Sequence, residues 1–206
     1  METEQTFPLN ETLRSIEQRR SVRVFLDQPV PQECIRAVLR AANQAPSAHN
    51  QQSWRFIVVS GGKKDELARL VSARAGNFSR PATALLRMAA RSIDSAPVVI
   101  AVANTGQLIA HGTELFKVGA EEAHDFFRTM EIQNSAAAAE NLLVAATSLG
   151  LATVWLGILY LIKDEVLHFL GEPKGEFMAV IPIGYAARMS SGPAKVPLEQ
   201  VVRRLQ

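Results

Sequence analysis

The sequence predicts an α+β fold, with one domain over residues 1–206 and a central mixed sheet of four to five strands flanked by helices. The first observation is size: 206 residues, 48% hydrophobic and 20% charged, can bury one sizeable core. The second is that short apolar runs typical of strands are interspersed with helical patterns. The third is a long central helical pattern at 121–149 that contains neither Gly nor Pro.

The first half of the chain is expected to hold three helices and one strand. Apolar spacing behind Asn10 predicts a helix to about Gln18, and Pro31 is expected at the first position of a second helix that ends near Asn43. The run 55–60, "RFIVVS", predicts a buried strand. A short helix around 67–71 follows the Gly61-Gly62 turn.

The second half is expected to begin with a helix over 82–94 and a strand over 97–104 that is buried on both faces. Residues 105–119 have three Gly and no clear periodicity, which indicates a loop or lid. After the long helix, Gly150 stands where a helix C′ residue belongs. The remaining elements are an extended piece at 151–159, a helix ending at Gly171, a strong strand in "EFMAVIPIGYA" and a Pro-rich tail.

The long helix also predicts an oligomer. Within it, "NSAAAAENLLVAATSL" (134–149) is apolar on nearly every face. A helix that is hydrophobic all round is buried all round. In a chain of this size we therefore expect its far side to lie at a dimer interface.

Charge and cysteine content exclude several classes of function. The net charge is +2, which gives no strong field for nucleic acid, and the single Cys34 allows neither an internal disulfide nor a cysteine metal cluster. No stretch reaches the ~18 apolar residues of a membrane span, and the N-terminus lacks a secretory signal. We expect a soluble cytoplasmic protein with no nucleic-acid or membrane partner.

Common catalytic motifs do not occur. The four histidines show no metal-ligand spacing, so no metal site is expected. There is no G-x-S-x-G elbow and no glycine-rich phosphate loop. Cys34 lies on the apolar side of its predicted helix, where a thiol behaves as a small hydrophobe.

Two polar segments remain as candidate sites. "RRSVR" (19–23) offers three arginine forks and the Ser21 hydroxyl, which suits a terminal phosphate, although a solvated charge run is the commoner role of such a segment. "APSAHNQQSW" (45–54) joins a helix to a strand and is unusually rich in amides. It could be a linker, an acid–base or metal site, or a cradle for a planar ligand.

Four segments in order resemble the nitroreductase family of flavin enzymes. "RRSVRVF" resembles the opening motif of that family, and "APSAHNQQSWRFIVV" resembles its second signature. "NLLVAATSLGLATVWLGI" resembles the central helix leading to the flavin, and "IPIGY" with the basic tail resembles the C-terminal strand and arm. The resemblance spans nearly the whole chain. It implies a nitroreductase-like fold and a homodimer with FMN at the interface.

The resemblance implies a set of FMN-binding residues but no catalytic side chain, because flavin N5 is the reactive atom. One group holds the phosphate, the pyrimidine edge and the N1/O2 side: Arg19, Arg20, Ser21, Arg23 and Lys195. A second group comes from the other subunit: Pro46, Ser47, Ala48, Asn50 and Gln52. A third covers one ring face, with a backbone N–H toward N5: Val154, Trp155, Leu156 and Gly157.

The sequence departs from the family pattern at several positions. Ser53 stands where Pro usually precedes the Trp, and Leu156 replaces an acidic residue of some members. Lys195 keeps the charge of the usual Arg and loses its fork. His49 falls on a variable position and is interpreted as structural or peripheral. Residues 105–127 match nothing in the pattern, in a region that forms the substrate-channel lid or an insertion, and 188–206 correspond to a C-terminal arm.

The resemblance implies an FMN-dependent oxidoreductase that transfers electrons from NAD(P)H to nitroaromatic, quinone or related small-molecule acceptors by a ping-pong mechanism. The alternatives are a reductive dehalogenase, a flavin-fragmenting cobalamin-ligand enzyme, a deazaflavin-biosynthesis reductase and a non-catalytic flavin-binding protein. Three questions stay open at this level: the physiological acceptor, the choice between NADH and NADPH, and whether Arg91 contacts FMN.

Overall fold

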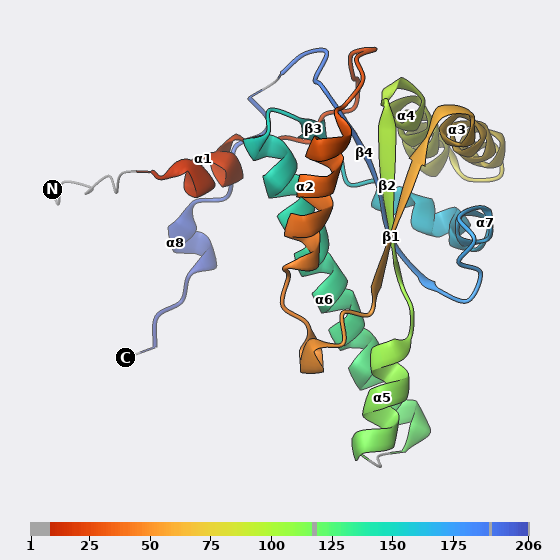
Figure 1. Ribbon diagram of the computed structural model, residues 1–206, viewed down its shortest axis with the longest axis vertical. Coiled ribbons are helices and arrows are strands. Elements are labelled where there is room, and N and C mark those ends of the chain that lie inside the picture. The colour runs from red at the N-terminus through yellow and green to blue at the C-terminus, as the bar shows by residue number, and fades with distance from the viewer. Residues whose placement is uncertain (1–8, 117–118, 190, 206) are drawn as a thin grey trace, which may run out of the picture.

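The computed structural model describes residues 9–116, 119–189 and 191–205. A four-stranded sheet in the order β1-β2-β4-β3 forms its centre (Figure 1). The strands are β1 (Trp54–Ser60), β2 (Val98–Asn104), β3 (Ala152–Thr153) and β4 (Glu176–Gly184). All three pairings of these strands are antiparallel, and a parallel bridge between Ser21 and Thr153 extends the β3 edge. The predicted α+β class is confirmed.

Helices cover both faces of the sheet (Figure 1). Helices α2 (Gln32–Asn43) and α6 (Ala120–Ser148) lie on one face, while α3 (Gly61–Ala75), α4 (Arg80–Ser95) and α7 (Lys163–Phe169) lie on the other. Successive side chains of a strand point to opposite faces, so β2 contributes to the core on both sides of the sheet. Ile100 and Val102 pack with α2 and α6, whereas Val99, Ala101 and Ala103 pack with α3 and α4.

The central strand is confirmed, and the first strand is corrected. All seven residues of β2 are buried, as its continuous apolar run predicts. The expectation of a buried strand at 55–60 was wrong for much of β1, where Val58 is 46% exposed. The reason is position: β1 lies at the edge of the sheet and pairs only with β2 among the described strands.

The long helix agrees with its predicted bounds within a residue at each end, and Gly150 has the left-handed φ of +72° expected after the helix. The loop predicted over 105–119 was wrong, because α5 (Gln107–Phe116) forms there and packs against α6. Residues 117–118 of that predicted lid lie outside the described residues. Gly112 favours a loop in the sequence pattern. In the structure it is a buried residue of α5 that packs against the Phe127 ring.

The N-terminal helix α1 (Glu11–Gln18) has the predicted cap, since Leu13 N–H donates to Asn10 Oδ1 at 2.9 Å. Pro31 is the N-cap of α2 rather than its first helical residue. Helix α3 begins directly at Gly61 and is longer than predicted. The short elements η1 (Ala48–Asn50), η2 (Gly157–Ile162) and α8 (Leu198–Val201) complete the chain. No helix among the described residues has the length and hydrophobicity of a membrane span.

Candidate functional site

The arginine segment begins where α1 ends. Val22 and Phe25 are buried, and Val22 N–H donates to Thr153 O at 2.9 Å, so the segment is held against the β3 edge. This alternation leaves Ser21 and Arg23 exposed, with Arg19 and Arg20 half-buried. The local fold therefore presents the polar side chains of "RRSVR" together on one surface.

These side chains line a cavity of about 530 Å³ together with the C-terminal arm. Four cationic groups and one carboxylate, Glu17, surround it, and the lining residues are Ile16, Glu17, Arg19, Arg20, Ser21, Arg23, Gly192, Pro193 and Lys195. Arg19 Nε lies 3.7 Å from Glu140 Oε1. Among the described residues, Arg20, Arg23 and Lys195 form no ion pair. This cavity, called the arginine cavity or basic cavity below, is thus strongly basic and suits an anionic group.

Arg20 connects the cavity to the arm. Its Nε donates to Ser191 O at 2.7 Å, and its Nη1 donates to the carbonyls of Glu17 and Arg19. Gly192 has a φ of +73°, and a Cβ there would lie 3.0 Å from Arg20 Cδ. Only glycine adopts this conformation at little cost and lets the backbone pass so close to the arginine. Sequence reasoning missed this contact, although the Gly192-Pro193 pair marks a turn.

The 46–52 segment lies elsewhere in the same chain. Its residues do not line the arginine cavity, and its η1 turn packs against α5 and α6. His49, Asn50 and Gln52 all have positive φ values, 52°, 52° and 47°. Each non-glycine residue with a positive φ costs roughly 1 kcal/mol or more in conformational free energy. Strained backbone conformations of this kind cluster at functional sites in stable proteins. Within one chain, the two predicted groups are therefore not brought together.

Hydrogen bonds hold this strained segment in place. Ala48 N–H donates to Asn134 Oδ1 at 3.3 Å, and Gln52 N–H donates to Ser47 Oγ at 3.1 Å. Gln52 Nε2 also donates to Asn50 Oδ1 at 3.1 Å. The amide-rich composition thus serves in part to fix the backbone of the turn itself.

The 154–157 segment continues from β3 and therefore lies next to the arginine segment. Val154 and Leu156 are buried, Trp155 is half-buried and Gly157 is exposed. Leu156 N–H donates to Val180 O at 2.9 Å, so that donor is already used. The exposed Gly157 is the better candidate to donate its N–H to a ligand.

Arg91 lies in a different cavity. That hollow, about 340 Å³, is formed between α3 and α4 and is also lined by Arg69 and Arg87. The arginine cavity with Lys195 is lined by none of these residues. The structure therefore gives no support to Arg91 as a neighbour of the "RRSVR" group.

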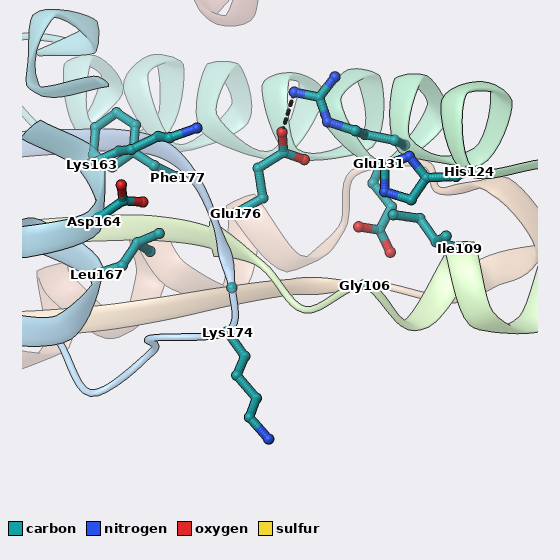
Figure 2. A pocket seen from close by; sticks show the side chains of 12 residues that line it. Gly106, Ile109, His124, Glu131, Lys163, Asp164, Leu167, Lys174, Glu176 and Phe177 are labelled. Atoms are coloured by element: carbon teal, nitrogen blue, oxygen red, sulfur yellow. Dashed lines mark ion pairs between the residues drawn. The ribbon is translucent and has the colours of Figure 1, made fainter. Parts of the chain in front are cut away.

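A further cavity of about 300 Å³ lies at the end of the sheet opposite the arginine cavity, where β2 ends and β4 begins (Figure 2). Arg128 and Glu176 form an ion pair across it. Glu131 lies in its wall and is fully buried, and this burial raises the pKa of its carboxyl above the ordinary value of 4.5. No group of three or more metal-ligating side chains occurs among the described residues.

The chain is similar in sequence to known proteins over most of its length. The family model described as "Nitroreductase family" matches residues 16–185. A protein from Archaeoglobus fulgidus is 31% identical over 183 residues, 86% of each chain. The FMN reductase [NAD(P)H] of Bacillus subtilis is 30% identical over 208 residues, covering 94% of this chain and 73% of its own.

The structure is similar to that of a solved protein as well. A nitroreductase with bound FMN from Desulfitobacterium hafniense superposes with a TM-score of 0.72 and 23% identity. The match covers 97% of this chain and 100% of the other. At that level of identity, the comparison establishes the fold.

Proposed function

The chain belongs to the nitroreductase family, and from this premise we propose that it is an FMN-dependent oxidoreductase transferring electrons from NAD(P)H to nitroaromatic, quinone or related acceptors. The FMN reductase of Bacillus subtilis supports both the cofactor and the donor. Donor and acceptor are proposed to use one face in turn, which gives ping-pong kinetics. A cytoplasmic location is part of the proposal, because NAD(P)H is available there.

The single observation that carries the proposal is the basic cavity. Arg20 and Arg23 after α1 and Lys195 in the C-terminal arm converge on it, and none of the three forms an ion pair with a carboxylate among the described residues. Charge-assisted hydrogen bonds to a phosphate would compensate this excess of positive charge. The Ser21 hydroxyl adds a neutral donor. This donor set fits the phosphate end of FMN.

Other residues would hold the remainder of the cofactor. The Val154–Gly157 segment follows Thr153, which pairs with Ser21, so it can cover one face of a ring whose phosphate lies in the cavity. We propose that Gly157 N–H donates toward N5. When bound, FMN supplies the hydride chemistry. The arginines of the cavity would stabilise negative charge on the bound cofactor.

A second copy of the chain would complete the site. The 46–52 segment is apart from the arginine cavity in one protomer, which supports its assignment to the partner's FMN. The arm also exposes apolar side chains, with Leu198 at 68% and Val201 at 65%. Exposed apolar groups of this kind mark interaction surfaces. We propose a homodimer in which α6 and the arm contribute to the interface.

Reconstitution with FMN tests the proposal directly. The purified protein should carry, or take up, one FMN per chain and show a yellow flavin spectrum. A colourless protein that takes up no added FMN would contradict it. The matched measurement with riboflavin should give much weaker binding, because riboflavin lacks the phosphate that the basic cavity would hold.

A further inference from the structure

Three arginines gather in the cavity between α3 and α4, which is called the α3–α4 cavity below. Arg69 belongs to α3, and Arg87 and Arg91 belong to α4. The cavity has a volume of about 340 Å³, and the buried alanines Ala68 and Ala90 also line it. The two helices pack on each other along this line. Three long cationic side chains therefore share one hollow with small apolar residues.

Helical spacing explains why the arginines meet here. Arg87 and Arg91 are four residues apart, so they lie one above the other on the same face of α4. Arg69 and Ser72 are three residues apart on α3 and line the same cavity. Like charges at the i, i+4 spacing repel each other and destabilise a helix. The arrangement is therefore unfavourable unless an anion neutralises it.

These three arginines lack the ion pairs that other arginines form. On the same helix α3, Arg74 Nε lies 3.3 Å from Glu165 Oε1. Among the described residues, none of the three cavity arginines forms an ion pair, although the carboxylate of Asp94 lines the same cavity. Arg69 Nε donates to Asp65 O at 3.3 Å. Most of the guanidinium donors are thus available to a ligand.

The charge and the donors of this lining match a phosphate dianion. Three guanidiniums and one carboxylate give the lining a formal charge of +2. A phosphate monoester carries a charge of about −1.5 to −2 at pH 7. Guanidinium forks donate pairs of hydrogen bonds to phosphate oxygens, and the Ser72 hydroxyl adds a neutral donor. One phosphate monoester would therefore neutralise the lining almost completely.

The α3–α4 cavity is distinct from the basic cavity proposed to hold FMN. The two cavities share no lining residue. Helices α3 and α4 cover the face of the sheet opposite to α2 and α6 (Figure 1). The proposed dimer uses α6 and the C-terminal arm, so the α3–α4 cavity would stay open to solvent in it. A ligand here would not compete with FMN for the same residues.

We propose that Arg69, Arg87 and Arg91 form a second anion site, which binds the phosphate group of a phosphate monoester between α3 and α4. This site goes beyond the proposed function, because it neither holds FMN nor takes part in electron transfer. A bound phosphate would bridge the two helices. Two sources supply this chemistry, a soluble phosphate ester and the headgroup of phosphatidic acid.

Nuclear magnetic resonance with inorganic phosphate tests the site. Phosphate replaces chloride at constant ionic strength, and the arginine Nε–H signals are followed. The signals of Arg69, Arg87 and Arg91 should shift together with one Kd. Because each arginine reports its own surroundings, binding of phosphate or FMN in the basic cavity does not obscure the result. Absence of a saturable shift in these three signals would overturn the proposal.

A charge-matched pair of variants tests which arginines bind the phosphate. In Arg87→Gln, the Kd read from Arg69 and Arg91 should rise about tenfold or more, because hydrogen bonds to a charged group are lost. Arg80→Gln removes an exposed arginine of α4 outside the cavity and should keep the wild-type Kd. Equal Kd values in the two variants would mean that phosphate only screens the surface charge, and would overturn the site.

Further probes test the charge of the ligand and identify its source. Glycerol 3-phosphate should shift the same signals, while glycerophosphocholine, a diester with one negative charge on its phosphate, should bind about tenfold more weakly. A diester that binds as tightly as the monoester would overturn the assignment to a dianion. Co-sedimentation of the wild type, but not of Arg87→Gln, with phosphatidylcholine vesicles containing phosphatidic acid would support the lipid as the source. No co-sedimentation, with binding of glycerol 3-phosphate, would support a soluble ester.

Discussion

Arg20 of the basic cavity makes structural contacts in addition to its proposed role in binding phosphate. The Arg20 guanidinium donates three hydrogen bonds to backbone carbonyls, one of them on the C-terminal arm at Ser191. The sequence motif predicts a cluster of phosphate-binding arginines, but it does not reveal that one of them also holds the arm. Because that arm brings Lys195 to the cavity, we expect the loss of Arg20 to remove one cation and to displace another.

The change Arg20→Ala should weaken FMN binding by about 2 kcal/mol or more, roughly thirtyfold in Kd, because hydrogen bonds to a charged group are lost. Fluorescence titration of the apoprotein with FMN measures this. Arg14→Ala removes an exposed arginine of α1 outside the cavity and should leave the Kd unchanged. Equal affinities for the wild type and Arg20→Ala would refute the phosphate role.

Gly192 provides an independent test of the arm. Gly192→Ala forces a left-handed φ on a residue with a Cβ and crowds Arg20, at a cost of roughly 1–2 kcal/mol. We expect the arm to detach, with faster proteolysis after Arg188 or Lys195 and weaker FMN binding, while the melting temperature changes little. Gly76→Ala, at a φ of −66° with open space around it, is the matched control. A protected arm in Gly192→Ala would show that the close approach of Gly192 to Arg20 is dispensable.

At the scale of elements, hydrophobic periodicity predicted the strand and the helix with long apolar patterns. It failed for a helix that contains glycine and for the exposure of an edge strand. The strand β2 and the helix α6 have long apolar patterns, and both were predicted nearly to the residue. Helix α5 was missed because Gly106 and Gly112 are usually read as loop residues, whereas Gly112 is required by close packing. The edge position of β1 depends on which strands pair, and no local pattern encodes it.

The packing of α5 on α6 predicts the effect of filling Gly112. In Gly112→Ala, the added Cβ collides with the Phe127 ring, so we expect a loss of about 1–3 kcal/mol in the free energy of unfolding, as in other overpacked cores. Urea denaturation followed by circular dichroism gives the value. Gly62→Ala, at an open position of α3, should be neutral or slightly stabilising. An unaffected Gly112→Ala would mean that α5 does not pack as described.

At the scale of the whole molecule, one protomer holds only part of the proposed FMN site. The sequence motifs predicted which residues belong to the site, but a linear motif cannot say which chain each residue comes from. Here the geometry is informative, because the segments 19–23 and 154–157 are neighbours while 46–52 packs beside α5. The proposed homodimer, in which each chain contributes its 46–52 segment to the partner's site, would reconcile the motif with the structure.

Subunit mixing tests this composite site. A variant damaged in the arginine cavity, Arg20→Ala with Arg23→Ala, and a variant damaged in the turn, Ser47→Ala with Asn50→Ala, should each bind FMN weakly. When the two are unfolded together and refolded, each mixed dimer should regain one intact site and measurable FMN binding. Each variant refolded alone is the control. No gain on mixing would mean that the site is built within one chain.

The most direct test of the central claim is anaerobic reduction of the FMN-reconstituted protein. NADH or NADPH should bleach the flavin absorbance within the turnover time, and menadione added afterwards should restore it, with product formed in equal amount. A bound flavin that neither nicotinamide reduces would contradict the oxidoreductase function and favour a non-catalytic flavin-binding protein.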